Sequence, residues 1–212
     1  MMKHFSTEAI AAMEQRFRAQ FINSAPGYKN LCLVGTRSAA GVNNLAVFNS
    51  LFHVGANPPL LGLVFRPDSV DRHTLMNIRE TGFYTLNLVS EGMEAAAHQT
   101  SARYPSDVSE FDAVGLSPVF SGAFHAPAVA ESPLRMGMKL EEEIHVALNG
   151  TSIVIGSICW LECAEQAIGE DGFVDPAHSK VITVCGLDAY YKTELKGRYA
   201  YAKPDKKPAL LL

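Results

Sequence analysis

The sequence predicts a mainly β protein, an antiparallel barrel or sandwich with a few decorating helices. Helical periodicity opens the chain, many strand-like segments follow, and the other helices are inserted among the strands instead of alternating with them. Two long strands, over 134–148 and 152–163, flank Asn149-Gly150, and Asn-Gly is the strongest short signal for a β-hairpin. This order argues against the alternating pattern of a parallel α/β fold.

The chain begins with a predicted amphipathic helix over 6–21. Its apolar residues recur at spacings of three and four and are Ile10, Met13, Phe17 and Phe21. Ser6 or Thr7 can cap its start, and the segment 23–27, which contains proline and glycine, is expected to end it.

Strands and short helices follow. The next strands are expected over 31–36, 44–51, 60–66 and 83–89, and Asn57-Pro58-Pro59 separates the second from the third because proline cannot donate to a ladder.

One short helix is predicted over 71–81, with its apolar side inward and Gly82 as its C-terminal stop. Another is predicted over 92–101, with Ser90 as its cap.

The region 103–127 is a long, weakly patterned stretch with three prolines. Loops of this length are usually functional or part of an interface. A short strand over 181–185 comes next, and a Pro- and Lys-rich tail closes the chain. We therefore expect an N-terminal helix over 1–24, a main domain over 25–200 and a tail over 201–212.

Composition excludes several classes of protein. The 212 residues carry a net charge of −4 and only 19% charged side chains, without a basic run that would bind nucleic acid. An apolar share of 48% excludes intrinsic disorder. No apolar run approaches the about 18 residues of a membrane span, and the N-terminus lacks the apolar core of a secretory signal.

Cysteine usage indicates a reducing compartment. Cys32, Cys159, Cys163 and Cys185 lie in apolar, strand-like contexts and are expected to be buried reduced thiols in the cytoplasm. No histidine or cysteine lies at ligand spacing from another to suggest a metal site, so none is expected.

Familiar catalytic motifs are missing from the sequence. It contains no G-x-S-x-G elbow, no P-loop, no H-E-x-x-H zinc motif and no G-x-G-x-x-G turn after a strand.

The most informative block spans 35–87. Donors that can bind an anion gather before and at the start of a predicted helix: Arg66, Ser69, Arg72 and Thr74. The strand over 44–50 has small side chains, so a flat ring can approach its backbone. An aromatic ring system with a phosphate fits both halves, and a capped helix beside an ordinary hairpin is the alternative.

An ordered series of short segments carries a family resemblance. The segments are Asn44-Leu45-Ala46, Asn49-Ser50, Asn57-Pro58-Pro59-Leu60, Arg72-His73-Thr74, Asn77-Ile78, Thr81-Gly82-Phe83, Asn87-Leu88-Val89, Phe111-Asp112, Gly115-Leu116, Ala126-Pro127, Glu131-Ser132-Pro133, Ile153-Val154-Ile155-Gly156 and Gly186-Leu187-Asp188-Ala189-Tyr190-Tyr191. Together they resemble the flavin reductase-like, FMN-binding split-barrel family. The likeness covers residues 25–200, and it rests on the series because no single segment is specific.

This resemblance implies a six-stranded antiparallel split β-barrel, a homodimer, and FMN bound at the dimer interface. In the family the small-residue strand, here 44–50, lies along the flavin, and the polar loop and helix start, here 66–74, hold the ribityl or phosphate groups. The family's usual Lys-Asp-Thr is Arg72-His73-Thr74 here, so the positive charge is kept while His73 can add or remove a phosphate donor. The expected cofactor contacts are Thr36, Asn44, Leu45, Ala46, Val47, Asn49, Ser50, Arg66, Ser69, Arg72, His73 and Thr74.

The implied function is that of an FMN-dependent oxidoreductase that accepts hydride from NADH or NADPH at flavin N5. Its acceptor is left open as a small molecule or a partner oxygenase. The chemistry belongs to the cofactor, so no catalytic side chain is expected. His53 is a candidate for the nicotinamide pocket, and a partly exposed strand histidine is the alternative. Two other hypotheses remain: an FMN-binding electron-transfer protein without NAD(P)H activity, and a flavin-free binding protein on the same scaffold.

The low charge and the apolar share suggest that more surface is buried than a monomer needs. A homodimer accounts for this excess. The Leu-rich end 210–212 and the N-terminal helix are the candidates for the additional buried area.

Overall fold

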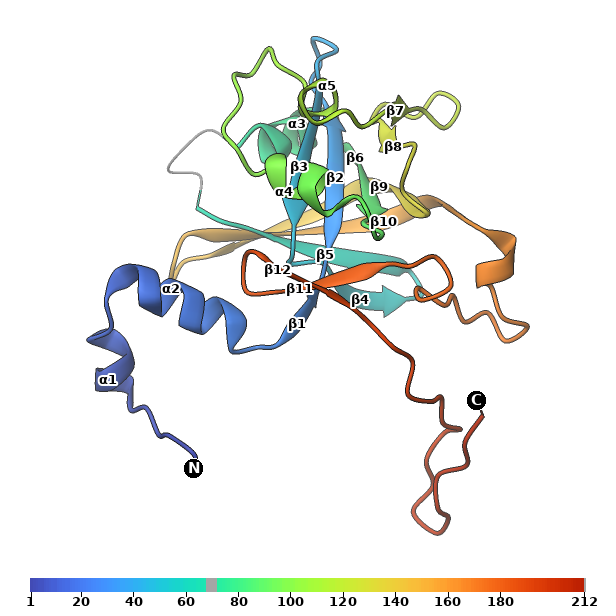
Figure 1. The fold of residues 1–212 in the computed structure, drawn as a ribbon. Helices are drawn as coiled ribbons and strands as arrows, with labels where there is room; N and C mark the ends of the chain where they lie inside the picture. Colours follow the sequence, from blue (N-terminus) through green and yellow to red (C-terminus); the bar gives the residue numbers. More distant parts are fainter. Residues whose placement is uncertain (68–71, 212) are drawn as a thin grey trace.

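The computed structural model describes residues 1–67 and 72–211, and it is built around one antiparallel sheet of seven strands (Figure 1). The strand order is β3–β2–β6–β9–β10–β5–β4. The strands are β2 (Cys32–Arg37), β3 (Asn43–Phe48), β4 (Phe52–Ala56), β5 (Pro59–Phe65), β6 (Phe83–Leu88), β9 (Leu134–Val146) and β10 (Thr151–Cys163). The predicted mainly β, antiparallel class is confirmed, and the Asn149-Gly150 turn joins β9 to β10 as expected.

Strand β4 was not predicted, because its sequence was assigned to the connection between two other strands. It pairs with β5 across the Asn57-Pro58 turn and lies at the edge of the sheet, where prolines at a strand end are tolerated. The ring of Phe52 lies over Gly62 on β5, in the space that a β-carbon there would need. The glycine therefore allows the edge strand to pack closely on its neighbour.

A smaller sheet combines the two ends of the chain. It has the order β1–β11–β12, with β1 (Tyr28–Asn30), β11 (Ile182–Cys185) and β12 (Ala189–Lys192). Two N-terminal helices precede it, α1 (Thr7–Ala11) and α2 (Gln15–Ser24). The predicted single helix over 6–21 is wrong, because the Glu14 carboxylate accepts from the backbone N–H groups of Arg16 and Phe17 and begins a second helix.

Three further helices lie at one end of β2 and β3 (Figure 1). They are α3 (His73–Thr81), α4 (Glu94–Gln99) and α5 (Glu110–Val114). Gly82 ends α3 with a φ of 75°, the left-handed conformation that favours glycine, as predicted. Ser90 does not cap α4, because Met93 occupies the N-cap position. In the described part of the chain, no helix is long and apolar enough to cross a membrane.

Short elements complete the chain. The pair β7 (Pro118–Val119) and β8 (Ala128–Val129) forms a two-stranded sheet within and just after the long region that was expected to be a loop. A 3₁₀ turn, η1 (Glu165–Ala167), follows β10.

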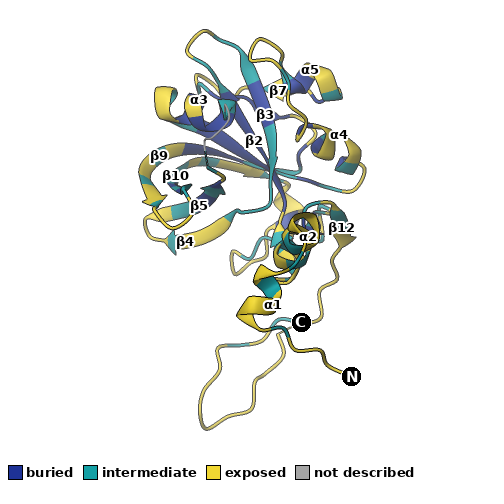
Figure 2. Cartoon of the chain, turned by 90° about the vertical axis from the view of Figure 1, so that its left-hand side faces the viewer, coloured by how far each residue is buried: buried dark blue, intermediate teal, exposed yellow. Residues whose placement is uncertain are grey.

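Strand β2 is buried on both faces (Figure 2). Leu33 points into one apolar cluster, with Phe111 and Val184, while Val34 points into a second cluster, with Ile78. Helices therefore cover the sheet on both sides of this strand.

The prediction that all four cysteines are buried is correct only for Cys32. Cys159 is exposed, and Cys163 and Cys185 are intermediate, because β10 and β11 each turn one face towards solvent. All four are free thiols.

Tyr84 supplies a test of the core packing. Its fully buried hydroxyl has no hydrogen-bond partner among the described residues. A β-carbon added at Gly156 would clash with this hydroxyl and would lie 2.8 Å from the Lys139 carbonyl oxygen. We expect Gly156→Ala to lower the free energy of unfolding by about 1–3 kcal/mol through overpacking. Tyr84→Phe should raise it by about 1 kcal/mol, because it removes an unsatisfied buried hydroxyl.

Urea denaturation of the two single variants and the double variant measures both effects. The cost of Gly156→Ala should fall in the Tyr84→Phe background, since one of the two close contacts is then absent. Strict additivity of the two substitutions would contradict this packing.

Candidate functional site

An open groove of about 1210 Å³ runs along β3. Strands β3 and β5 and the start of α3 form one wall, and α4, residues 100–106 and the β11–β12 turn form the other. Gln20 and Asn23 of α2 extend the second wall, so the N-terminal helices take part in the site.

The groove brings together most of the predicted cofactor contacts. Nine of the twelve line it: Asn44, Ala46, Val47, Asn49, Ser50, Arg66, Arg72, His73 and Thr74.

The other three contacts, and the separate candidate His53, are not among the described residues that line the groove. Thr36 is fully buried behind Asn44, and the side chain of Leu45 points into the core. Ser69 lies outside the described residues. His53 is exposed on β4 and does not line the groove, which agrees with the alternative of a strand histidine.

A buried network fixes the wall of the groove at Asn44. The Asn44 amide Nδ2 donates to Thr36 Oγ1 at 3.1 Å and to Thr74 Oγ1 at 3.0 Å. Asn77 Nδ2 also donates to Thr36 Oγ1, at 3.1 Å. This network joins β2, β3 and α3, so it sets the position of the α3 N-terminus relative to the strand.

One end of the groove is positively charged. Lys29, Arg66, Arg72 and His73 line it, and among the described residues none of them forms an ion pair. Burial lowers the pKa of Lys29, and nearby Arg66 lowers it further. The N-cap residue Arg72 makes no side-chain cap hydrogen bond to α3, and the N–H groups at the helix start add to the positive potential. This donor set is suited to a phosphate.

Strand β3 is an edge strand, so half of its backbone groups are not used by the sheet. The Leu45 N–H points away from β2 and donates to Glu110 Oε2 at 2.9 Å. By the alternation of a strand, the Val47 backbone points the same way and into the groove. A heterocycle with polar edges can therefore be bound by main-chain groups beside the small side chain of Ala46.

The sequence interpretation offered Tyr190 or Tyr191 as a pocket residue, with ordinary packing as the alternative, and Tyr190 lies in the opposite wall. The rest of this wall was missed. His98 Nδ1 lies 2.8 Å from the Tyr190 hydroxyl, and the two rings are nearly perpendicular. Asn49 Nδ2 donates to the Gly186 carbonyl oxygen at 2.9 Å. Each contact joins segments about a hundred residues apart. The only features of the sequence that pointed to this wall were the unusual length of the loop after 103 and the Tyr190-Tyr191 pair.

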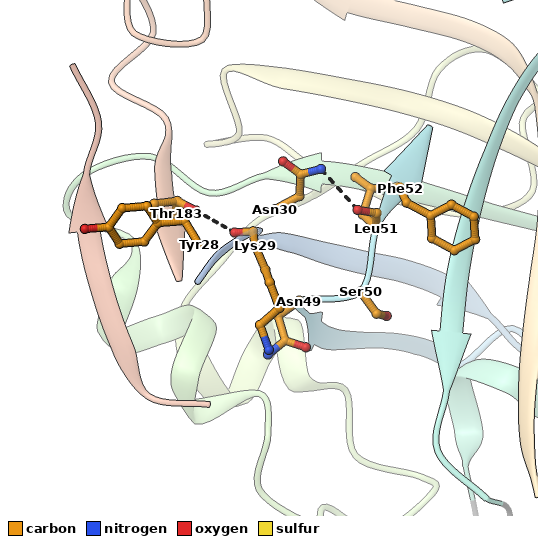
Figure 3. Close-up of a pocket in the computed structure, with 8 residues that line it drawn as sticks. All are labelled: Tyr28, Lys29, Asn30, Asn49, Ser50, Leu51, Phe52 and Thr183. Atoms are coloured by element: carbon orange, nitrogen blue, oxygen red, sulfur yellow. Dashed lines mark hydrogen bonds between the residues drawn. The ribbon is translucent and has the colours of Figure 1, made fainter. Parts of the chain in front are cut away.

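A smaller cavity of about 500 Å³ adjoins the groove (Figure 3). Lys29, Asn49 and Ser50 line both cavities, and Tyr28 and Phe52 line the small one. Ser50 Oγ binds both the N–H and the carbonyl oxygen of Val64, at 3.1 and 2.9 Å. The sequence analysis predicted that the strand over 44–50 lies along the flavin. The Ser50 contact attaches the end of this segment to β5.

Comparison with known proteins identifies the family. The model of the flavin reductase like domain matches residues 29–180. The chain belongs to the flavin reductase-like family. A crystal structure from Shewanella frigidimarina, named as a flavin reductase with a split barrel domain, is 46% identical, with a TM-score of 0.92 over 95% of this chain and 100% of that chain.

More distant structures share the fold. Nitrilotriacetate monooxygenase component B of Bacillus cereus is 23% identical, with a TM-score of 0.81 over 93% of this chain and 98% of that chain. Flavoredoxin of Desulfovibrio vulgaris is 22% identical, with a TM-score of 0.69 over 84% of this chain and 92% of that chain. The split-barrel prediction is confirmed, with seven strands in the large sheet in place of six. Family and fold support a flavin cofactor and an oxidoreductase.

Glu110 gives a pH-dependent test of the groove floor. It is buried, and burial raises its pKa above the ordinary 4.5, although the Leu45 N–H and nearby His73 oppose the shift. The folded state therefore binds this proton more tightly than the unfolded state, and stability falls as the pH rises through the folded pKa. Glu110→Gln cannot ionise but keeps an oxygen for Leu45, so we expect it to be more stable than the wild type at pH 7.

Urea denaturation across a pH series checks this expectation. The advantage of Glu110→Gln should disappear below pH 4.5, the unfolded-state value, where the wild-type carboxyl is protonated in both states. The exposed Glu170→Gln serves as the matched control and should show no such trend. An advantage that is the same at every pH would contradict a raised pKa.

Proposed function

We propose that this protein is an FMN-dependent oxidoreductase that takes hydride from NADH or NADPH and passes electrons to an acceptor. The observation that supports this most is that one groove combines a small-residue edge strand with a cluster of cations that form no ion pair within residues 1–67 and 72–211. The strand suits a flat heterocycle and the cations suit its phosphate.

The residues of the groove fit FMN in their donor chemistry. Arg72, Thr74 and the N–H groups at the start of α3 would hold the phosphate, with Arg66 beside them. Backbone groups at Val47 would meet the polar edge of the ring, next to Ala46. Bound FMN supplies reversible electron and hydride transfer.

The chain's own residues bind and orient. The Asn44–Thr36–Thr74 hydrogen bonds hold the strand and the helix start in place. His98 and Tyr190 form part of the wall opposite β3. The volume of the groove, about 1210 Å³, is larger than that of a typical site for one small ligand, which is about 300–1,000 Å³. A nicotinamide nucleotide therefore has room beside the flavin.

The assembly and the acceptor are part of the same proposal. We infer a homodimer with FMN at its interface, because the groove is open along one side in a single chain. A small molecule or an oxygenase component is the electron acceptor, and the likeness to a monooxygenase component B favours testing the second. The four free thiols fit a reducing cytoplasm.

Anaerobic mixing tests the proposed function. Protein loaded with FMN should lose its flavin absorbance on mixing with NADH or NADPH, with the FMN-free protein as the control. Failure to bind FMN would overturn the proposal. Binding without bleaching by either nucleotide would instead indicate an electron-transfer protein without NAD(P)H activity.

Arg72→Ala tests the phosphate end. We expect the variant to bind FMN at least about tenfold more weakly, because a charge-assisted contact to the phosphate is lost. Riboflavin, which has no phosphate, should bind the variant and the wild type equally. Fluorescence titration with both flavins measures this, and Arg16→Ala, an exposed arginine on α2, is the matched control. Equal weakening of both flavins would place Arg72 away from the phosphate.

A further inference from the structure

The last part of the chain, residues 193–211, forms an arm that extends away from both sheets (Figures 1 and 2). Large apolar side chains project from it into solvent. The exposed fraction is 93% at Tyr201, 63% at Tyr199, 61% at Leu210 and 55% at Leu211. Such residues are costly to leave in water when they are grouped on one segment.

The arm has a defined conformation of its own. The Ala200 N–H donates to the Ala209 carbonyl oxygen at 2.9 Å, and the Leu211 N–H donates to the Arg198 carbonyl oxygen at 2.7 Å, so the arm folds back on itself as a narrow antiparallel loop. At its base, the Arg198 guanidinium lies 4.0 Å from the ring centroid of Phe173 and pairs with Asp171. The base is therefore fixed, and the arm has a set direction away from its own domain.

The total surface is too large for a compact monomer. The chain exposes 12881 Å², whereas a folded monomer of 23.0 kDa exposes about 9,600 Å². The surplus of about 3,300 Å² exceeds the about 800 Å² that each partner buries in a standard interface, and it is comparable to what each partner buries in large obligate dimers.

Exposed apolar surface continues from the arm onto the small sheet. Tyr28 and Tyr191, on β1 and β12, have ring centroids 4.9 Å apart and exposed fractions of 66% and 42%. Leu195, at the start of the arm and four residues after Tyr191, is 46% exposed. Tyr28 also lines the small cavity that adjoins the groove (Figure 3). The apolar surface therefore reaches the edge of the candidate site.

We propose that the arm of one copy lies against a second copy of this chain and buries Tyr199, Tyr201 and Leu210 there. The proposal rests on the homodimer of the proposed function and adds an exchange of arms. In a two-fold dimer each arm makes the same contact on the other copy, so both arms are buried together. The fixed base at Arg198 directs each arm away from its own domain, which favours the second copy over a return to the first.

Isotope-mixed cross-linking tests where the arm lies. Full-length protein in natural nitrogen and in ¹⁵N is refolded together and treated with a lysine-reactive cross-linker. Lys203, Lys206 and Lys207 of the arm should form links of mixed isotope, which join two copies. Links from these lysines that stay within one isotope form would mean that the arm folds onto its own chain, and they would overturn the proposal.

Sedimentation separates this proposal from the proposed dimer. The double variant Tyr201→Ser/Leu210→Ser should raise the dimer dissociation constant at least about tenfold. Its circular dichroism spectrum should match that of the wild type, because both side chains are exposed in the single chain. Leu148→Ser, at the 98% exposed tip of the β9–β10 hairpin, is the matched control and should have no effect. A monomeric wild type overturns the dimer itself, and a dimer unaffected by the double variant overturns only the arm exchange.

Discussion

The pairing of β3 with β2 is the interaction on which the site depends. Strand β2 is buried on both faces, so it is held rigidly between two apolar clusters, and β3 takes its position and twist from it. Because no strand of the described residues pairs with the other side of β3, its outer backbone groups are not used by the sheet. The Glu110 carboxylate accepts from the outward N–H of Leu45. The next outward backbone groups, at Val47, face the groove. An edge that is a liability in most sheets is here the surface that we propose for the cofactor.

The polar network extends this rigidity to the cationic end. Thr36 is the buried acceptor shared by two amides, one from β3 and one from α3. The helix start cannot shift without leaving a buried donor unpaired, which is costly in a dry interior. The donors for a phosphate are thus set at a fixed distance from the strand that would hold the ring.

Local patterns predicted the elements that interact within about fifty residues of sequence. The small-residue strand, the glycine stop at 82 and the arginine-rich helix start were all identifiable, because period, turn chemistry and charge are properties of a short window. Strand β4 was missed because the two prolines that follow it were interpreted as a break, although they form the turn to β5. The N-terminal helix was interpreted as continuous because the side chain of Glu14, which begins the second helix, fits a helix interior equally well.

The second wall could not be predicted, since no local pattern encodes contacts such as His98 with Tyr190. The groove is completed only when β11 pairs with β1, and Thr183 Oγ1 donates to the Lys29 carbonyl oxygen across 154 positions of sequence. Such distant pairing has a consequence for biosynthesis. On the ribosome, β3 and the start of α3 are synthesised long before β11 and β12, which contribute to the opposite wall of the groove. The complete groove can therefore form only after the C-terminal part has left the ribosome.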